Sequence, residues 1–437
     1  MATQSAQPAA RALNRQDYKT LALSALGGAL EFYDFIIFVF FAVIVGDHFF
    51  PADIPEWLRQ FQTFGIFAAG YLARPLGGII MAHFGDLVGR KRMFTLSILL
   101  MALPTLLIGL LPTYGQIGMA APLLLLLLRI LQGAAIGGEV PGAWVFVAEH
   151  VPARRVGLGC GILTAGLTAG ILLGSLVATA LKTNLSPEAV ALWGWRLAFV
   201  LGGLFGILAM YLRRWLHETP VFAELQARKA LAAELPLKSV LREHKLSVLL
   251  SMLLTWLLSA AIVVLILMAP TYLQKSFNVA PAEAMQANSL AIVCLTLGCV
   301  LVGRIIDAIG SGLTFLLGSL GLALTTWWFF TGLQQGSDQL FVHYALVGAF
   351  VGIVGAVPFV MVKAFPPVVR FSGLSFSYNV AYAIFGGVTP MLVTLWMKDE
   401  VMAPAYYVMA LCLMGAVIGL WLLLQSRRVP QWQTSAA

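Results

Sequence analysis

Charged side chains stand inside apolar stretches of this chain, where charge is costly. Glu31 and Asp34 share one such stretch, and Arg129 and Glu139 share a later one. Residues three apart lie on one face of a helix, so Glu31 and Asp34 are expected to face the same way. Ionisable groups at membrane depth are rare and mark ion or substrate pathways. These four residues therefore predict a charge-handling path within a membrane.

The placement of Asp34 and Arg129 predicts a pair that handles protons. Each lies near the middle of its apolar stretch, so the two side chains are expected at a similar depth. An ionised Asp34 is tolerated beside Arg129, and a conformational change that separated them would favour protonation of Asp34. A permanent structural salt bridge is the alternative. Glu139 follows Arg129 by ten residues, about 15 Å along a helix, so a proton-path role and a structural partner elsewhere both stay open.

A second arginine, Arg74, precedes Pro75 in another apolar stretch. Proline removes a backbone donor and disfavours helical geometry in the residue before it, so we expect a bend that aims Arg74 inward. Arg74 and Arg129 are the charged candidates for substrate binding, and an anion would bind more easily once a nearby carboxylate is protonated. The uncharged candidates are polar or aromatic residues within apolar stretches: Tyr33, Trp256, Ser259, Tyr378, Asn379 and Tyr382. Most other aromatic residues are expected to pack or to face lipid.

The composition places the chain in a membrane. Of its 437 residues 60% are hydrophobic and only 11% are charged, and the mean hydropathy is +0.89. The net charge of +8 is spread over short loops rather than gathered in a basic, aromatic-lined patch, which argues against nucleic acid as a partner. No nucleotide-binding fingerprint, nucleophile motif or metal-ligand spacing appears. We therefore expect no enzyme activity, no cofactor and no metal.

Twelve apolar stretches have about the 20 residues that a membrane helix needs. They lie at 21–45, 61–84, 93–111, 118–149, 158–181, 193–215, 247–273, 284–303, 314–332, 339–365, 373–396 and 402–425. A charged linker divides them, so we expect five regions: an N-terminal segment 1–20, a six-helix bundle 21–215, a linker 216–246, a second six-helix bundle 247–425 and a tail 426–437. The chain is thus predicted to be an all-α membrane protein of two pseudo-symmetric bundles.

The basic residues predict how the chain is oriented. With both termini in the cytoplasm, most of the 27 Lys and Arg residues fall in cytoplasmic segments. An excess of Lys and Arg in cytoplasmic loops is the usual signal of orientation. We expect a multi-pass protein of the inner, or plasma, membrane, surrounded by the lipid bilayer and working as a monomer.

Several short motifs occur in order at the expected crossings. They are 28–35 (GALEFYDF), 74–78 (RPLGG), 129–133 (RILQG), 137–139 (GGE), 193–196 (WGWR), 218–220 (ETP) and 383–387 (AIFGG). Together they resemble the major facilitator superfamily, and within it the metabolite:proton symporter family. The resemblance implies two bundles that rock around a central site in alternating access. It also implies proton-driven uptake of small metabolites, commonly carboxylates such as citrate or ketoglutarate and zwitterions such as betaine or proline. Asp34 and Arg129 match the proton-linked pair of the sugar symporters.

The turn 85–92, between the second and third crossings, resembles the superfamily's cytoplasmic gate motif. A weaker copy in the second bundle keeps Asp307 but lacks the arginines that usually follow it, and Lys363 stands where the family usually has a glutamate. We therefore expect Asp307 and Lys363 to lie close together. The predicted gate residues are Asp86, Arg90, Lys91, Glu149, Asp307 and Lys363.

These observations predict a secondary active transporter that takes up a small organic acid or zwitterion together with protons. A proton-coupled antiporter that exports an apolar compound or a siderophore is the first alternative, because the charges do not set the direction of transport. A transporter-like receptor that no longer cycles is the second, although the presence of Asp34 and Arg129 argues against it.

Overall fold

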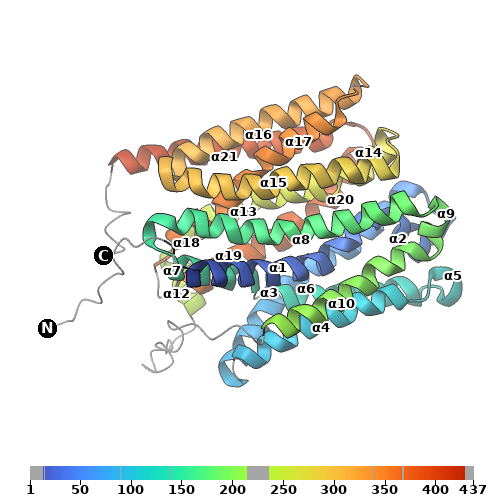
Figure 1. Cartoon of the computed structure of the whole chain (residues 1–437), viewed down its shortest axis with the longest axis horizontal. Coiled ribbons are helices and arrows are strands. Elements are labelled where there is room, and N and C mark those ends of the chain that lie inside the picture. Colours follow the sequence, from blue (N-terminus) through green and yellow to red (C-terminus); the bar gives the residue numbers. More distant parts are fainter. Residues whose placement is uncertain are drawn as a thin grey trace.

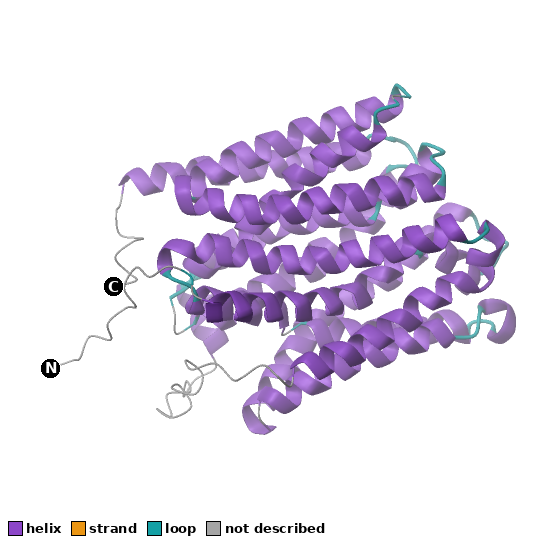
Figure 2. Cartoon of the chain, viewed as in Figure 1, coloured by secondary structure: helices purple, strands orange, loops and turns teal. Residues whose placement is uncertain are grey.

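The structure is a computed structural model that describes residues 13, 15–88, 90–137, 139–213, 236–336, 338–366 and 369–428. Throughout these residues every regular element is a helix (Figure 2). Helices satisfy all backbone hydrogen bonds within one segment, which a lipid environment demands of apolar stretches of this length. We refer to residues 15–213 as the first half and to residues 236–428 as the second half.

The helices of the first half follow one another with short connections. They are α1 (Arg15–Phe40), α2 (Ala42–Phe49), α3 (Glu56–Val88), α4 (Arg90–Leu110), α5 (Tyr114–Ile117), α6 (Ala120–Ile136), α7 (Glu139–His150), η1 (Ala153–Arg155), α8 (Val156–Asn184), α9 (Pro187–Ala189), η2 (Val190–Gly194) and α10 (Trp195–Arg213). The helix α3 runs through Pro75 without interruption.

The helices of the second half are more often broken by short turns of tighter or wider helix. They are α12 (Pro236–Glu243), α13 (Lys245–Ile262), η3 (Val263–Leu267), α14 (Ala269–Ser276), α15 (Pro281–Ile309), α16 (Ser311–Gln334), α17 (Leu340–Val351), η4 (Gly352–Ala356), α18 (Val357–Ala364), α19 (Arg370–Ala381), η5 (Tyr382–Gly386), α20 (Gly387–Trp396) and α21 (Ala403–Arg428).

Each of the twelve predicted crossings coincides with a helical run. Ten runs among the described residues are long and apolar enough to cross a membrane. The other two, α3 and α4, extend over 33 and 21 residues. Two predicted boundaries shift: α1 begins at Arg15, inside the predicted N-terminal segment, and α12 occupies the last part of the predicted linker. The remainder of the linker, 216–235, lies outside the described residues.

The long helices lie side by side, so that the bundle has two ends (Figure 1). The start of α1 and the end of α21 lie at one of these ends, which we call the termini side. The short helices α2, α5, α9 and α14 lie at the other end, which we call the opposite side. The first long helix therefore begins, and the last one ends, on the same side of the bundle.

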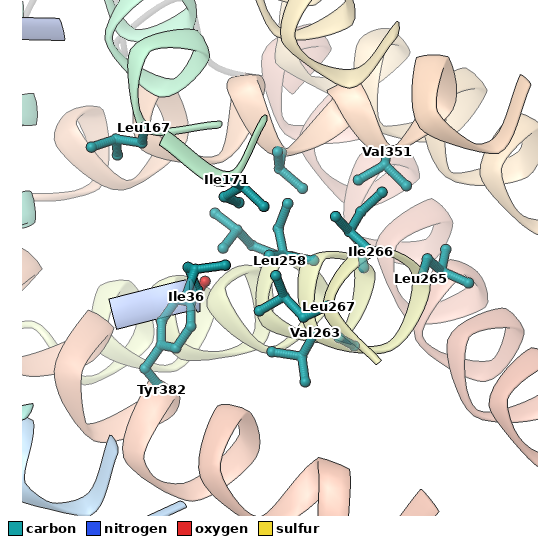
Figure 3. Packing of buried hydrophobic residues seen from close by; sticks show 14 of the residues in the cluster. Ile36, Leu167, Ile171, Leu258, Val263, Leu265, Ile266, Leu267, Val351 and Tyr382 are labelled. Carbon is teal, nitrogen blue, oxygen red and sulfur yellow. The ribbon is translucent and has the colours of Figure 1, made fainter. Parts of the chain in front are cut away.

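The halves meet along α8 and α15 in a close helix-to-helix contact. A Cβ atom added to Gly303 on α15 would lie 2.6 Å from the carbonyl oxygen of Gly157 on α8, so only glycine permits this approach. Buried apolar side chains fill the space between the halves. Figure 3 shows part of this cluster, with Ile36 and Ile171 from the first half and Leu258 and Tyr382 from the second.

Candidate functional site

Arg129 lies on α6 with its side chain fully buried. Its Nη1 donates to the carbonyl oxygen of Phe35 at 3.1 Å and to Oε1 of Gln132 at 2.9 Å. The guanidinium lies over the rings of Phe35 and Phe38, 4.3 and 4.6 Å from their centroids, and near that of Phe67 at 5.4 Å. Its Nε and Nη2 have no hydrogen-bond partner. The cation is therefore held by aromatic faces and keeps unused donors.

Asp34 is as buried as Arg129, but its carboxyl oxygens have no hydrogen-bond partner among the described residues. It faces two glycines of α10. A Cβ added to Gly202 would lie 2.8 Å from Oδ1, and one added to Gly206 would lie 3.2 Å from Oδ2. Only glycine therefore leaves room for this carboxyl group. The sequence offered a signal for this, because two glycines four residues apart leave one face of a helix bare.

The predicted ion pair between Asp34 and Arg129 is not formed in this structure. Arg129 reaches the backbone of Phe35, so the predicted equality of depth holds. Consecutive residues of a helix point about 100° apart, however, and Phe35 is the residue that faces α6. Asp34 faces α10 instead. Depth along a helix leaves the facing side open, so an ion pair between Asp34 and Arg129 in another conformation stays a prediction.

Five of the predicted site side chains fall outside the described part of the structure. They are those of Glu31, Asp86, Arg90, Lys91 and Glu139. Their roles in proton coupling and in the gate stay predictions.

Arg74 on α3 is buried at the boundary between the halves, with 1% of its side chain exposed. Its guanidinium lies over three tyrosine rings, 5.3 Å from the centroid of Tyr71, 5.2 Å from that of Tyr378 and 4.7 Å from that of Tyr382. Tyr71 belongs to the first half, and Tyr378 and Tyr382 to the second. We call these three residues the tyrosine cage. Neither Nε nor Nη2 of Arg74 has a hydrogen-bond partner within the described part of the chain.

The structure thus brings together three predicted substrate contacts, Arg74, Tyr378 and Tyr382. Asn379, a fourth, lies beside them and donates to the carbonyl oxygen of Gly137 in the first half. The sequence prediction missed Tyr71, although it precedes Arg74 by three residues and therefore shares its helix face.

Trp144 on α7 packs against the tyrosine cage from the side of the first half. Its ring meets that of Tyr378 edge-on at 4.9 Å, and its indole N–H donates to Oγ1 of Thr164 on α8. Nothing in the local sequence distinguishes Trp144 from the lipid-facing tryptophans, so only the fold identifies it.

Three other predicted substrate contacts use their polar groups within their own half. The hydroxyl of Tyr33 donates to the carbonyl oxygen of Ala198 on α10 at 2.7 Å. The indole N–H of Trp256 donates to the hydroxyl of Tyr407 on α21 at 2.7 Å. The hydroxyl of Ser259 donates to its own helix at 3.0 Å. Each polar group is satisfied within its own half, as buried aromatic donors usually are, and the substrate contacts of these three residues stay predictions.

Two contacts join the halves on the termini side. Glu149 at the end of α7 pairs with Nη1 of Arg370 at the start of α19, at 3.1 Å. The carboxylate of Asp307 on α15 accepts hydrogen bonds from the backbone N–H groups of Gly157 and Leu158, at 2.8 and 2.9 Å. These amides lie in the first turn of α8, where a helix leaves N–H groups without partners. Asp307 therefore caps a helix of the other half.

Lys363 is near enough to Asp307 for an electrostatic interaction, as the sequence predicts. Its ammonium group lies over the ring of Phe359, 4.1 Å from the centroid. Among the described residues no ion pair joins Lys363 to Asp307 directly. The partners of this carboxylate are backbone amides, which no pattern of charged residues could reveal.

Asp307→Asn should loosen this latch between α15 and α8. The amide keeps the size of the side chain but retains one acceptor, and its NH₂ group faces a backbone donor. Hydrogen bonds to a charged group contribute about 1.5–3 kcal/mol, so we expect the amides of Gly157 and Leu158 to exchange hydrogen at least about tenfold faster. Hydrogen-exchange mass spectrometry measures this. Asp399→Asn, at an exposed turn, is the control. Unchanged protection in Asp307→Asn would exclude the latch.

Further contacts join the halves on the opposite side. Lys275 at the end of α14 forms an ion pair with Glu56 at the start of α3. Lys398 lies over the ring of Trp57, 3.7 Å from its centroid. The described residues therefore connect the halves at both ends of the bundle, and Arg74 with its tyrosine cage lies enclosed between them.

Known families, sequences and structures resemble this chain. The model of the family described as Major Facilitator Superfamily matches residues 24–390. The chain is 30% identical over 430 residues to the glycine betaine/proline/ectoine/pipecolic acid transporter OusA of Dickeya dadantii (strain 3937), covering 92% of this chain and 83% of the relative. It is 32% identical over 396 residues to the inner membrane metabolite transport protein YhjE of Escherichia coli (strain K12), covering 87% and 88%. The solved structure of the proton:xylose symporter XylE, bound to 6-bromo-6-deoxy-D-glucose, superimposes with a TM-score of 0.74 at 15% identity, covering 93% and 94%.

Proposed function

The chain belongs to the Major Facilitator Superfamily and is a multi-pass membrane transporter of a small molecule, and from this premise we propose that it imports a small zwitterion or organic acid together with protons. Two six-helix bundles, 21–215 and 247–425, rock around a central site in alternating access. Both termini lie in the cytoplasm, and the termini side is the cytoplasmic side.

The observation that carries this proposal is Arg74 inside the tyrosine cage. A buried guanidinium with two unused donors is a binding site for a carboxylate, because its planar fork matches the two carboxylate oxygens. Once Arg74 turns to a carboxylate, the three ring faces can receive a cationic group. A substrate that carries both groups uses the whole site.

A known relative supports the choice of a zwitterion over a simple acid. OusA is named for glycine betaine, proline, ectoine and pipecolic acid. Each of these compounds joins a carboxylate to a cationic nitrogen over a short distance. Arg74 and the tyrosine cage place the two complementary groups, a guanidinium and three ring faces, side by side.

Proton coupling is assigned to Asp34. An unpaired carboxyl group buried beside glycines favours its neutral form, whereas a neighbouring cation favours the charged form. Arg129 packs against the neighbouring face of α1, and its Nε and Nη2 are unused donors. A rotation or shift of α1 against α6 that brought the two together would release the proton. Glu31 and Glu139 are proposed to extend the proton path.

The gate on the cytoplasmic side is proposed to combine the two latches described above with the turn 85–92. Glu149 and Arg370 form one latch, and Asp307 with the first turn of α8 forms the other. Asp86, Arg90, Lys91 and Lys363 complete the charged network. Partly shielded pairs of this kind are favoured over isolated surface pairs, which contribute little.

Uptake into proteoliposomes tests the proposal. Purified protein is reconstituted, and the entry of radiolabelled glycine betaine, proline or citrate is followed with and without an imposed inward proton gradient. We expect the gradient to drive accumulation of a zwitterion and a protonophore to abolish it. Accumulation of citrate alone would change the substrate class to organic acids. Uptake that ignores the gradient would refute proton coupling.

Arg74→Gln should weaken substrate binding strongly. Glutamine keeps a polar group of moderate size but loses the charge and the fork, and two charge-assisted hydrogen bonds of about 1.5 kcal/mol each correspond to roughly a hundredfold in affinity. The KM for uptake and the Kd of the transported zwitterion measure this effect. Arg59→Gln is the control, because Arg59 pairs with the half-exposed Asp47 on the opposite side, at 3.4 Å. Equal affinities in the two variants would exclude Arg74 as the carboxylate site.

A further inference from the structure

Two neutral polar side chains fill the space between Arg129 and Asp34. Gln132 on α6 accepts from Nη1 of Arg129 at 2.9 Å, and its own Nε2 donates to Oγ1 of Thr105 on α4 at 2.6 Å. The hydroxyl of Thr105 donates to the carbonyl oxygen of Met101, one turn earlier, at 2.8 Å. All of these side chains are buried. Arg129, Gln132 and Thr105 thus form a continuous hydrogen-bonded chain that ends beside α10.

The methyl group of Thr105 faces Asp34. A Cβ added to Gly202 would lie 2.7 Å from Cγ2 of Thr105 and 2.8 Å from Oδ1 of Asp34, so the methyl group and the carboxyl oxygen face the same small space. The hydroxyl of Thr105 points the other way, to Gln132. A single rotation about the Cα–Cβ bond of Thr105 brings its hydroxyl to the side of Asp34. In helices threonine populates two such rotamers, because its hydroxyl bonds to the preceding turn.

We propose that Thr105 is a positioning residue that links the ionisation state of Asp34 to the hydrogen bond between Gln132 and Arg129. With Asp34 protonated, the methyl group of Thr105 faces the carboxyl and the hydroxyl holds Gln132, which fixes Arg129. With Asp34 ionised, the hydroxyl turns and donates to the carboxylate, because a buried charge without a donor is costly. Gln132 then loses its acceptor and no longer fixes Arg129, whose remaining contacts are the carbonyl oxygen of Phe35 and the aromatic rings. The hydroxyl keeps its proton throughout.

Few charged groups compete with Thr105 at this point. Tyr33 is the described residue that interacts electrostatically with Asp34, and its hydroxyl is bound to the carbonyl oxygen of Ala198. The faces of α4 and α10 that meet Asp34 carry Ala102, Gly202 and Gly206, which have no polar side-chain atoms. Among the described side chains of α4, which are those from residue 99 on, Thr105 is therefore the one that can supply a donor to the ionised carboxyl group.

The test is an infrared titration of the Asp34 carboxyl band. The protein in lipid, without substrate, is titrated with acid, and the band of the protonated carboxyl group that disappears in Asp34→Asn is followed. Thr105→Val removes the donor at nearly constant shape, so the ionised form loses stabilisation and the midpoint should rise by about one pH unit. That shift equals about 1.4 kcal/mol, the size of one hydrogen bond to a charge. Thr105→Ser keeps the hydroxyl and should restore the wild-type midpoint.

Gln132→Leu supplies a second test with the opposite sign. Without Gln132 the hydroxyl of Thr105 is free to serve Asp34, so the midpoint should fall. In the double variant Thr105→Val and Gln132→Leu, the midpoint should match that of Thr105→Val, because the effect of Gln132 acts through Thr105. If Gln132→Leu lowers the midpoint equally in both backgrounds, Arg129 acts on Asp34 directly and Thr105 is no link. An unchanged midpoint in Thr105→Val or in Gln132→Leu overturns the proposal as well.

This inference rests on the proposed proton coupling through Asp34, but its test does not require transport. Gradient-independent uptake by the wild-type protein would refute the proposed function whatever the titration shows. Gradient-driven uptake together with an unchanged midpoint in Thr105→Val would refute only the role of Thr105.

Discussion

Asp34→Asn should abolish gradient-driven accumulation of substrate while exchange of substrate across the membrane continues. Asparagine nearly preserves the shape of the side chain but cannot bind or release a proton in this range. The carboxyl group of Asp34 has no hydrogen-bond partner, so its replacement removes no contact from the structure. Accumulation should fall to the level of protein-free vesicles, and counterflow of labelled against unlabelled substrate should stay measurable.

The same reasoning separates this result from simple misfolding. An unpaired neutral carboxyl group and an amide are alike in size and charge, so Asp34→Asn should melt at the temperature of the wild-type protein. Asp47→Asn is the matched control, because Asp47 is half exposed on the opposite side and pairs with Arg59. It should accumulate substrate normally. Normal accumulation by a well-expressed Asp34→Asn variant would remove Asp34 from the mechanism.

Arg129→Lys should damage transport severely although it keeps the positive charge. The planar guanidinium lies among the rings of Phe35, Phe38 and Phe67 and bonds through Nη1 to two oxygens at once. Lysine is a compact, strongly hydrated charge that matches neither the ring faces nor a fork-shaped contact with a carboxylate. We expect at least about a tenfold loss of uptake rate, which corresponds to about 1.4 kcal/mol in the coupling step.

The control for this variant is Arg59→Lys, where the arginine is on the opposite side and its ion pair is partly exposed. Uptake is compared at matched amounts of protein in the membrane. Near-native uptake by Arg129→Lys would show that only the charge matters. The geometry of the guanidinium would then have no part in the mechanism.

The sequence by itself determined the class of protein, the number of crossings and the residues that carry charge into the membrane. These properties depend on the length and apolarity of local stretches, which each segment carries independently of its neighbours. The sequence predicts in this way that Arg74 lies within the membrane and is aimed inward. The structure places it, buried, at the boundary between the halves. The sequence also singles out Tyr378 and Tyr382 as polar aromatic residues within a crossing, and the structure places both rings beside Arg74.

Only the tertiary structure decided which side of each helix faces which neighbour. Asp34 and Phe35 are adjacent in the chain, yet one faces α10 and the other faces Arg129 on α6. Tyr33, Trp256 and Ser259 likewise find hydrogen-bond partners within their own half, which their positions in the chain do not reveal. A position in the chain sets the height of a residue along its helix. The rotation of that helix against its neighbours depends on how all the helices pack, which no single stretch encodes.

Some bonding partners of charged residues can likewise be predicted from the sequence, and others are visible only in the fold. Sequence patterns pair acids with bases, and they correctly brought Lys363 near Asp307. They could not show that the carboxylate binds backbone amides of α8, because every residue carries an amide and only the fold leaves these two unpaired at a helix start. The contact between Glu149 and Arg370 likewise joins residues from different halves. The charge of a residue and its depth in the membrane are thus local properties of this chain. The direction of its side chain and its bonding partner arise only when the twelve crossings pack together.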